Sequence, residues 1–184
     1  LALSVLSLTS LHAAEVFEAA LGRESELPKG KEADGIRGDF VLRSDKVEAT
    51  ISHNAPLRRA NMSTFYGPDG VSPGCLYDLT LRGAANDQLV VYGPCGHGAV
   101  SYVKTVATKS ESEAAVESVT TAAKNGGVFK RNEYRVKDGV QGIFITTILR
   151  NESDKAQKVN TKSDLTKFDS TGMSSDGIFW TDAI

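Results

Sequence analysis

The chain has 184 residues and a net charge of −2, with 40% hydrophobic and 24% charged residues. This length predicts one domain with a substantial core. Without a basic excess the chain is not expected to bind nucleic acid through its phosphates. The three histidines and two cysteines show no zinc-binding spacing, so we expect no metal site and no cofactor.

The N-terminal segment Leu1–Ala14 contains no Asp, Glu, Lys or Arg. It is too short for a membrane span, which needs about 20 apolar residues. Its composition is typical of the apolar core and cleavage region of a secretory signal, so we interpret residues 1–14 as a signal-peptide remnant. This interpretation predicts a secreted or periplasmic protein. The alternative is an ordinary N-terminal helix.

Residues 15–38 are expected to form a short helix over Glu15–Gly22 and then a polar linker that contains Pro28. A β-sandwich domain is predicted over residues 39–184. It begins with two apolar runs, FVLR and KVEATIS, which are separated by Ser44-Asp45 and predict a hairpin. In the second run Val47, Ala49 and Ile51 alternate with polar residues, as expected for a strand with one buried face.

The segment Cys75–Cys95 predicts a second hairpin. Two β-rich runs, Cys75–Arg82 and Gln88–Tyr92, flank a turn of small and polar residues. Each cysteine lies ten positions from Ala85, so folding about that residue would place the two side by side. In an exported protein such a pair is expected to form a disulfide. The alternative is two half-buried thiols.

The second half of the chain continues the β pattern. Glu113–Lys124 fits both a helical stripe and a strand, and its β-rich neighbours favour the strand. Val128–Val136 and Gly142–Leu149 predict a hairpin joined by a loop that contains Gly139. Short strands with frequent turn signals indicate a mainly β protein, an antiparallel β-sandwich. We expect this sandwich to be incomplete at its C-terminus, because the chain ends directly after the aromatic pair in Gly172–Ile184.

The irregular stretch between the two hairpins holds the candidate binding residues. Structured loops of this length in compact domains are often functional. Arginine forks, an amide and an aromatic ring suit recognition of sugar hydroxyls or a carboxylate. We therefore predict a carbohydrate or an acidic small molecule as the ligand. Alternatively, the arginines form ion pairs with Asp69, Asp78 or Asp87. The predicted ligand-binding residues are Arg58, Arg59, Asn61 and Tyr66.

Five stretches carry a resemblance to known proteins: GDFVLRSDKVEATIS, RRANMSTFYG, PGCLYDLTLRG, NDQLVVYGP and EYRVKDG…GIFITTILRNESD. They resemble the N-terminal β-domain of large secreted bacterial proteins of the planctomycete type. In some of those proteins a polymerase-and-histidinol-phosphatase-like metallohydrolase domain follows. The pattern is also similar to galactose-mutarotase-like supersandwich domains. The chain has no His-x-His pair, so no catalytic residue is carried over from either family.

These observations lead to a functional prediction. We expect a non-catalytic accessory or ligand-binding module of an exported bacterial protein, with a downstream domain of the same polypeptide as its partner. The alternative is the N-terminal part of a carbohydrate-active or metal-dependent hydrolase. In that case Asp78, Asp87 and Glu133 would be the carboxylates to test for general acid and base roles.

Overall fold

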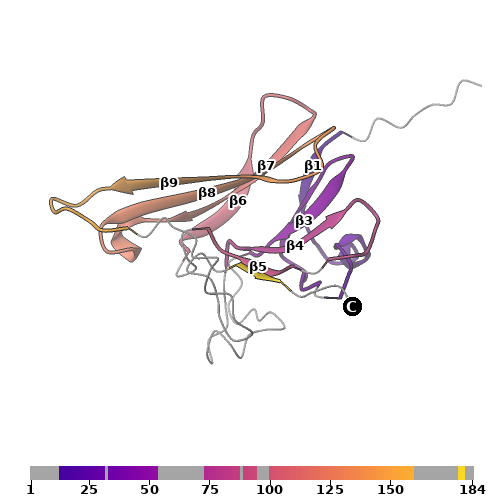
Figure 1. The fold of residues 1–184 in the computed structure, drawn as a ribbon, viewed down its shortest axis with the longest axis horizontal. Coiled ribbons are helices and arrows are strands. Elements are labelled where there is room, and N and C mark those ends of the chain that lie inside the picture. The colour runs from indigo at the N-terminus through magenta and orange to yellow at the C-terminus, as the bar shows by residue number, and fades with distance from the viewer. Residues whose placement is uncertain are drawn as a thin grey trace, which may run out of the picture.

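The fold consists of two antiparallel sheets that pack face to face (Figure 1). The computed structural model describes residues 13–31, 33–53, 73–87, 89–94, 100–159 and 178–180. Within these ranges there is no α-helix, which confirms the mainly β prediction. The first sheet has the order β1 (Glu15–Glu18), β2 (Phe40–Arg43), β3 (Val47–Ile51), β4 (Leu76–Leu81), β5 (Leu89–Tyr92) and β10 (Ile178–Trp180).

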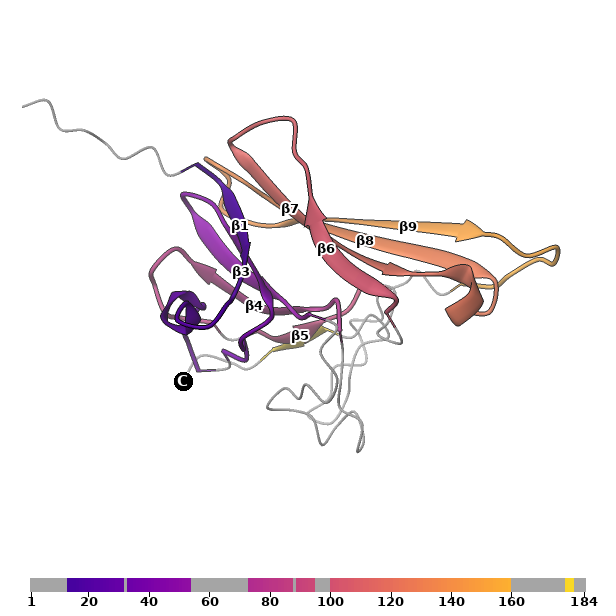
Figure 2. The same ribbon diagram turned by 180° about the vertical axis from the view of Figure 1, so that it is seen from behind.

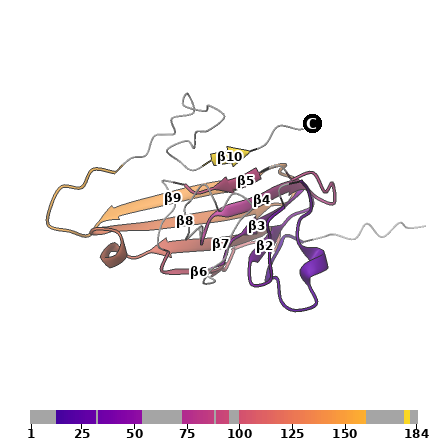
Figure 3. The same cartoon turned by 90° about the horizontal axis from the view of Figure 1, so that it is seen from below.

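The second sheet runs β6 (Tyr102–Val106), β7 (Glu113–Thr120), β8 (Val128–Lys137) and β9 (Phe144–Asn151). Seen from below, β5 to β2 lie beside β9 to β6 in the same order (Figure 3). The strand prediction for the ambiguous segment is confirmed, because β7 pairs with both β6 and β8. Two short 3₁₀ turns, η1 (Glu24–Glu26) and η2 (Ala122–Lys124), complete the elements of the described ranges.

The hydrophobic core lies between the sheets, and the period-2 alternation of each strand supplies it. Leu42 on β2 is opposite Ala49 on β3, and Val116 on β7 is opposite Tyr134 on β8; all four are fully buried. Burial of such side chains is the main favourable contribution to folding, at about 2 kcal/mol for a leucine. The remaining buried core residues are Phe40, Val47, Ile51, Leu76, Val100, Val103, Ala114 and Val136.

The helix predicted over Glu15–Gly22 is wrong, because Glu15–Glu18 is strand β1. This segment pairs in register with β2, from Glu15 opposite Arg43 to Glu18 opposite Phe40. Val16 packs against the core, whereas the next residue, Phe17, contacts arginines on the outer face of the sheet. The period of two thus overrides the helical preference of the alanines that follow. The first sheet therefore begins before residue 39.

The central hairpin forms as β4 and β5, but with a different register from the one expected. Leu76 is opposite Tyr92, whereas a hairpin symmetric about Ala85 would place it opposite Pro94. The turn is asymmetric because Gly83 and Ala85 both have positive φ, 69° and 50°, and Asn86 donates its backbone N–H to the Thr80 hydroxyl.

This register bears on the predicted disulfide. Cys75 carries a buried side chain, and the register of Leu76 and Tyr92 extrapolates to residue 93, not Cys95, as its opposite neighbour. No disulfide occurs among the described residues. Cys95 lies outside them, so the disulfide between Cys75 and Cys95 stays a prediction.

Candidate functional site

The sequence-predicted ligand residues Arg58, Arg59, Asn61 and Tyr66 lie outside the described residues. The structure does describe the two ends of the stretch that contains them. Ser52 N–H donates to Cys75 O at 2.9 Å, and Gly74 N–H donates to Ser52 O at 2.8 Å. The Tyr134 hydroxyl also donates to Gly74 O at 2.8 Å, from the opposite sheet. The stretch therefore leaves and re-enters the sandwich at one hydrogen-bonded point.

Polar side chains cover the outer face of the first sheet, the face that points away from the second sheet. They occupy the positions that alternate with the core residues along β2, β3 and β4. Although they point outward they are buried, because the connection between β1 and β2, with η1, lies over this side (Figure 2). These residues are Arg43, Glu48, Thr50, Asp78 and Thr80.

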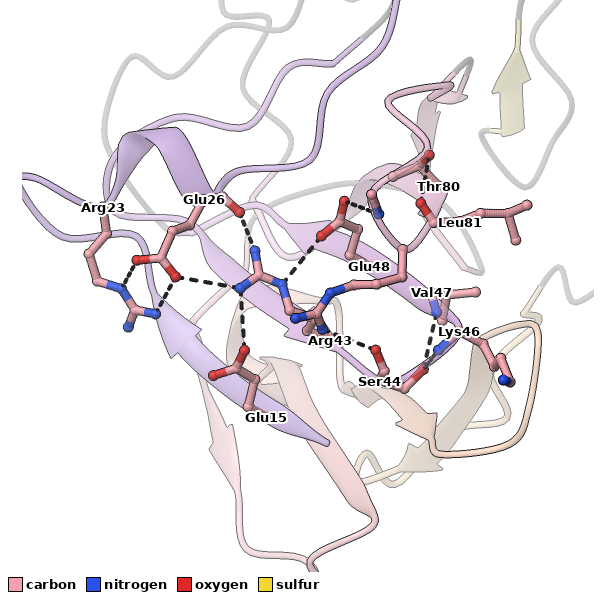
Figure 4. A network of polar contacts seen from close by, with 12 residues as sticks. Glu15, Arg23, Glu26, Arg43, Ser44, Lys46, Val47, Glu48, Thr80 and Leu81 are labelled. Carbon is pink, nitrogen blue, oxygen red and sulfur yellow. Dashed lines mark hydrogen bonds and ion pairs between the residues drawn. The ribbon is translucent and has the colours of Figure 1, made fainter. Parts of the chain in front are cut away.

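Arg43 is the centre of this face, and its guanidinium lies among three carboxylates (Figure 4). Its Nε donates to Glu48 Oε2 at 3.3 Å, and its Nη1 is 3.3 Å from Glu15 Oε1 and 3.5 Å from Glu26 Oε2. Nη2 donates to the backbone carbonyl of Glu26. The other oxygen of Glu48 accepts the Gly83 N–H at 3.3 Å. Arg43 thus links β2 to β1, β3 and η1, and Glu48 extends the network to the β4–β5 turn.

Arg23 adds an ion pair at the surface of this network. Its Nε is 2.7 Å from Glu26 Oε1, and its guanidinium lies 3.6 Å from the centre of the Phe17 ring. The hydrogen bond from Arg23 is the main cause that lowers the pKa of Glu26 to about 2. Glu26 is therefore ionised throughout the neutral range, and η1 presents a fixed negative charge.

A recess of about 230 Å³ opens beside the Arg43 network. Its wall includes the carboxylates of Glu26 and Glu48 and the cationic side chains of Arg43 and Lys29. We call it the Arg43 recess. The two negative and two positive residues of the lining balance each other. The recess therefore offers many hydrogen-bonding groups but carries no net charge. The other lining residues are Ser25, Leu27, Gly83 and Ala85.

Two buried aspartates fasten the connecting segment to the sheet. Asp78 on β4 accepts the backbone N–H groups of Asp34 at 2.7 Å and Gly35 at 3.0 Å. Asp39 accepts Ile36 N–H at 2.8 Å and His53 N–H at 2.9 Å. Hydrogen bonds to charged acceptors are stronger than neutral ones, so these carboxylates have a clear structural role.

Asp87 differs from the other two aspartates. Its Oδ1 accepts Leu79 N–H at 2.7 Å and Leu89 N–H at 3.4 Å, but its buried Oδ2 has no hydrogen-bond partner within the described ranges. Burial raises the pKa of Asp87 to about 7, and the negative charges of Asp78 and Asp34 contribute to the increase. An unpaired carboxylate oxygen in a dry site favours the protonated form.

Glu133, the third carboxylate considered for catalysis, lies elsewhere. It sits on the second sheet, where its Oε1 is 2.6 Å from Arg135 Nη2. Arg135 in turn pairs with Glu113 at 2.7 Å, and Glu117 pairs with Lys104 at 3.2 Å. Register places these residues on the outer face of that sheet. The structure therefore brings Asp78 and Asp87 together but separates both from Glu133 by the thickness of the sandwich, about 10 Å between sheets.

A second, larger recess of about 460 Å³ lies between β1 and the turn that joins β6 to β7. Its floor is apolar, with Val16, Val106 and Ala114, and Lys109 and Glu111 stand at its rim. It contains no clustered buried charges, so the Arg43 recess is the better candidate site.

Comparison with protein-family models, curated proteins and solved structures finds no match for this chain. In the part of the chain that the structure describes, no three His, Cys, Asp or Glu side chains lie close enough together to hold a metal ion. No helix in that part is long and apolar enough to cross a membrane.

Sequence reasoning missed the Arg43 recess. Arg43 directly precedes the Ser44-Asp45 turn and Glu48 lies three residues after that turn. Glu48 falls on the strand face opposite to the one that the alternation predicts to be buried, so the pattern did not indicate its burial. Glu26 and Lys29 gave no signal, because they belong to a stretch read as a linker.

Proposed function

We propose that the chain is an accessory ligand-binding module of an exported protein, and that the Arg43 recess takes a neutral, hydroxyl-rich ligand such as one sugar unit. The observation that carries the proposal is the composition of the recess. It combines two acidic and two basic residues, and hydrogen bonds and ion pairs hold three of them, Arg43, Glu26 and Glu48, in place.

The balance of charge favours a neutral ligand over the acidic alternative. An anionic group placed in the recess would lie beside Glu26 and Glu48, and a cationic group would lie beside Arg43 and Lys29. A hydroxyl group both donates one hydrogen bond and accepts others, so it can pair with either kind of side chain. A polyol therefore satisfies this lining without leaving a buried charge uncompensated.

The size and the rigidity of the recess also favour a small polar ligand such as one sugar unit. Sites for drug-sized ligands occupy about 300 to 1,000 Å³, and at about 230 Å³ this recess is smaller. It fits a single ring or the end of a chain. Because ion pairs already fix Arg43, Glu26 and Glu48, little side-chain entropy would be lost on binding.

A module of this kind would bind a sugar unit of a polymer and so keep a downstream domain of the same polypeptide close to that polymer. This matches the expected signal-peptide remnant and the resemblance to N-terminal β-domains of secreted proteins. Arg58, Arg59, Asn61 and Tyr66 remain candidates for additional ligand contacts, and Arg59→Ala tests them separately.

The experiment is a calorimetric titration of the chain with a panel of neutral and acidic monosaccharides and oligosaccharides. Ser25→Trp places a large ring in the Arg43 recess and should weaken binding by at least about tenfold. Ser110→Trp puts the same side chain at the other recess and serves as the control. The proposal is wrong if no neutral sugar binds, or if both tryptophan variants bind as tightly as the parent chain.

A further inference from the structure

Asp87 joins the connecting segment to the first sheet through its backbone as well as its side chain. Its N–H donates to Lys29 O at 3.2 Å, and Gly30 and Asp87 form an isolated parallel bridge. The approach is close, because a Cβ built on Gly30 would lie 2.2 Å from Asp87 N. Only glycine permits the segment to lie this near the strand.

The residues around this bridge also form the wall of the Arg43 recess. Lys29, which accepts from Asp87, lines the recess, and so does Leu27. A Cβ built on Gly35 would lie 3.0 Å from Leu27 Cδ2 and 2.8 Å from Asp78 Oδ2. Movement of residues 29–31 and 33–35 away from the sheet would therefore displace this side of the recess.

The charge of Asp87 opposes this closed arrangement. Among the described residues, the charged groups that act on it are Asp78 on β4 and Asp34 in the connecting segment, and both are negative. The side chain of Lys29 is exposed to solvent. When Asp87 loses its proton, its buried Oδ2 becomes part of an anion without a hydrogen bond on that oxygen.

We propose that the charge of Asp87 acts as a switch: residues 29–31 and 33–35 stay closed on the sheet when Asp87 is protonated, and they open when it is ionised. The Arg43 recess then keeps its wall under mildly acidic conditions and loses it under mildly alkaline ones. The consequence for binding rests on the proposed function, whereas the opening of the segment does not.

The direction follows from linkage. The pKa of Asp87 is raised from 3.8 to about 7 in the closed state, and an opened, hydrated carboxyl would have an ordinary value near 3.9. The closed state therefore binds more protons through this interval, and it becomes less favourable as pH rises through it. Between about pH 5.5 and pH 8.5 the opening equilibrium should rise by roughly tenfold or more.

The test is amide hydrogen exchange followed by NMR, with rates corrected for the intrinsic pH dependence of exchange. The reporters are the N–H groups of Asp34, Gly35 and Asp87, whose acceptors are known. In the parent chain their protection should fall about tenfold or more across that pH range. In Asp87→Asn, which cannot ionise, protection should stay constant. Asp154→Asn, at an exposed position, should behave as the parent chain does.

A second variant separates the switch from a merely structural effect. Asp34→Asn keeps Asp87 and its hydrogen bonds but removes one negative neighbour, so the midpoint of the change should move to lower pH. The proposal is overturned if the parent shows no change, if Asp87→Asn shows the same change, or if the midpoint in Asp34→Asn does not move. No ligand is used, so failure of the recess to bind sugars would leave this result standing.

Discussion

Replacing Arg43 with methionine tests whether its guanidinium holds the outer face of the first sheet together. Methionine retains much of the unbranched side chain but cannot donate hydrogen bonds. The change would remove the ion pairs of Arg43 with Glu48, Glu15 and Glu26 and its hydrogen bond to the Glu26 carbonyl. The contact of the Arg43 guanidinium with the Phe17 ring would also be lost, whereas that of Arg23 would remain.

The expected cost comes mainly from Glu48. Its side chain is 11% exposed, so in the variant it would be a buried carboxylate with only the Gly83 N–H as a described partner. Breaking a buried ion pair from one side costs about 3 to 5 kcal/mol. Glu15 and Glu26 are 45% and 38% exposed, so water compensates for most of their loss. We expect Arg43→Met to lower the free energy of unfolding by about 3 to 4 kcal/mol.

The assay is equilibrium unfolding in urea, with fluorescence and circular dichroism compared to confirm a two-state transition. Adding Glu48→Gln to Arg43→Met should restore about 2 kcal/mol, because the neutral amide no longer leaves a buried charge. Arg150→Met is the matched control; this arginine is 61% exposed, and its replacement should cost less than about 1 kcal/mol. A loss below about 1 kcal/mol in Arg43→Met, or no recovery in the double variant, would refute the reasoning.

Three further predictions concern the hydrogen-bonded junction of the two sheets and the pH response. Gly74→Ala should destabilise the chain by more than about 2 kcal/mol in urea unfolding, because φ is +70° and the new Cβ would lie 2.5 Å from Ser118 Cβ. Tyr134→Phe should cost about 1 to 2 kcal/mol in the same assay, since Gly74 O would lose its donor; equal stability would contradict the assigned hydrogen bond. The raised pKa of Asp87 makes its contribution to stability complete below its ordinary value of 3.8 and lost as pH rises through about 7. Asp87→Asn should therefore gain stability relative to the parent at about pH 8, by roughly 2 to 4 kcal/mol, and little at about pH 4 in thermal unfolding.

The strands of the sandwich could be predicted because they obey one local rule. Val47, Ala49 and Ile51 alternate with polar residues, and all three form part of the core. The apolar residues of Gly142–Leu149 predict a strand, and β9 spans Phe144–Asn151. The same alternation holds in β1, but at Glu15–Gly22 only four strand residues precede the alanines, too few for the period to be recognised in the sequence. There the partner strand β2, distant in sequence, determined the structure.

The candidate site could not be predicted in the same way. Its charges come from β2, β3, η1 and the segment that follows η1, and nothing in their spacing shows that one connecting segment covers them all. Lys29 and Glu26 belong to a stretch that looks like a linker by composition. What makes it part of the structure is a set of buried carboxylates, Asp78 and Asp39, that accept its backbone N–H groups. Sequence patterns identify buried apolar residues far better than buried acceptors of this kind.

The hydrogen bonds that join Ser52 to Gly74 and Cys75 have an evolutionary consequence. The sandwich is closed at this point by its own backbone, so the two ends of the stretch between these residues are held together by groups outside that stretch. The entropic contribution to the free energy of closing such a loop increases only slowly with its length, by about 0.6 kcal/mol for each doubling. Natural selection, or a protein engineer, could therefore lengthen or replace residues 54–72 without rebuilding the scaffold.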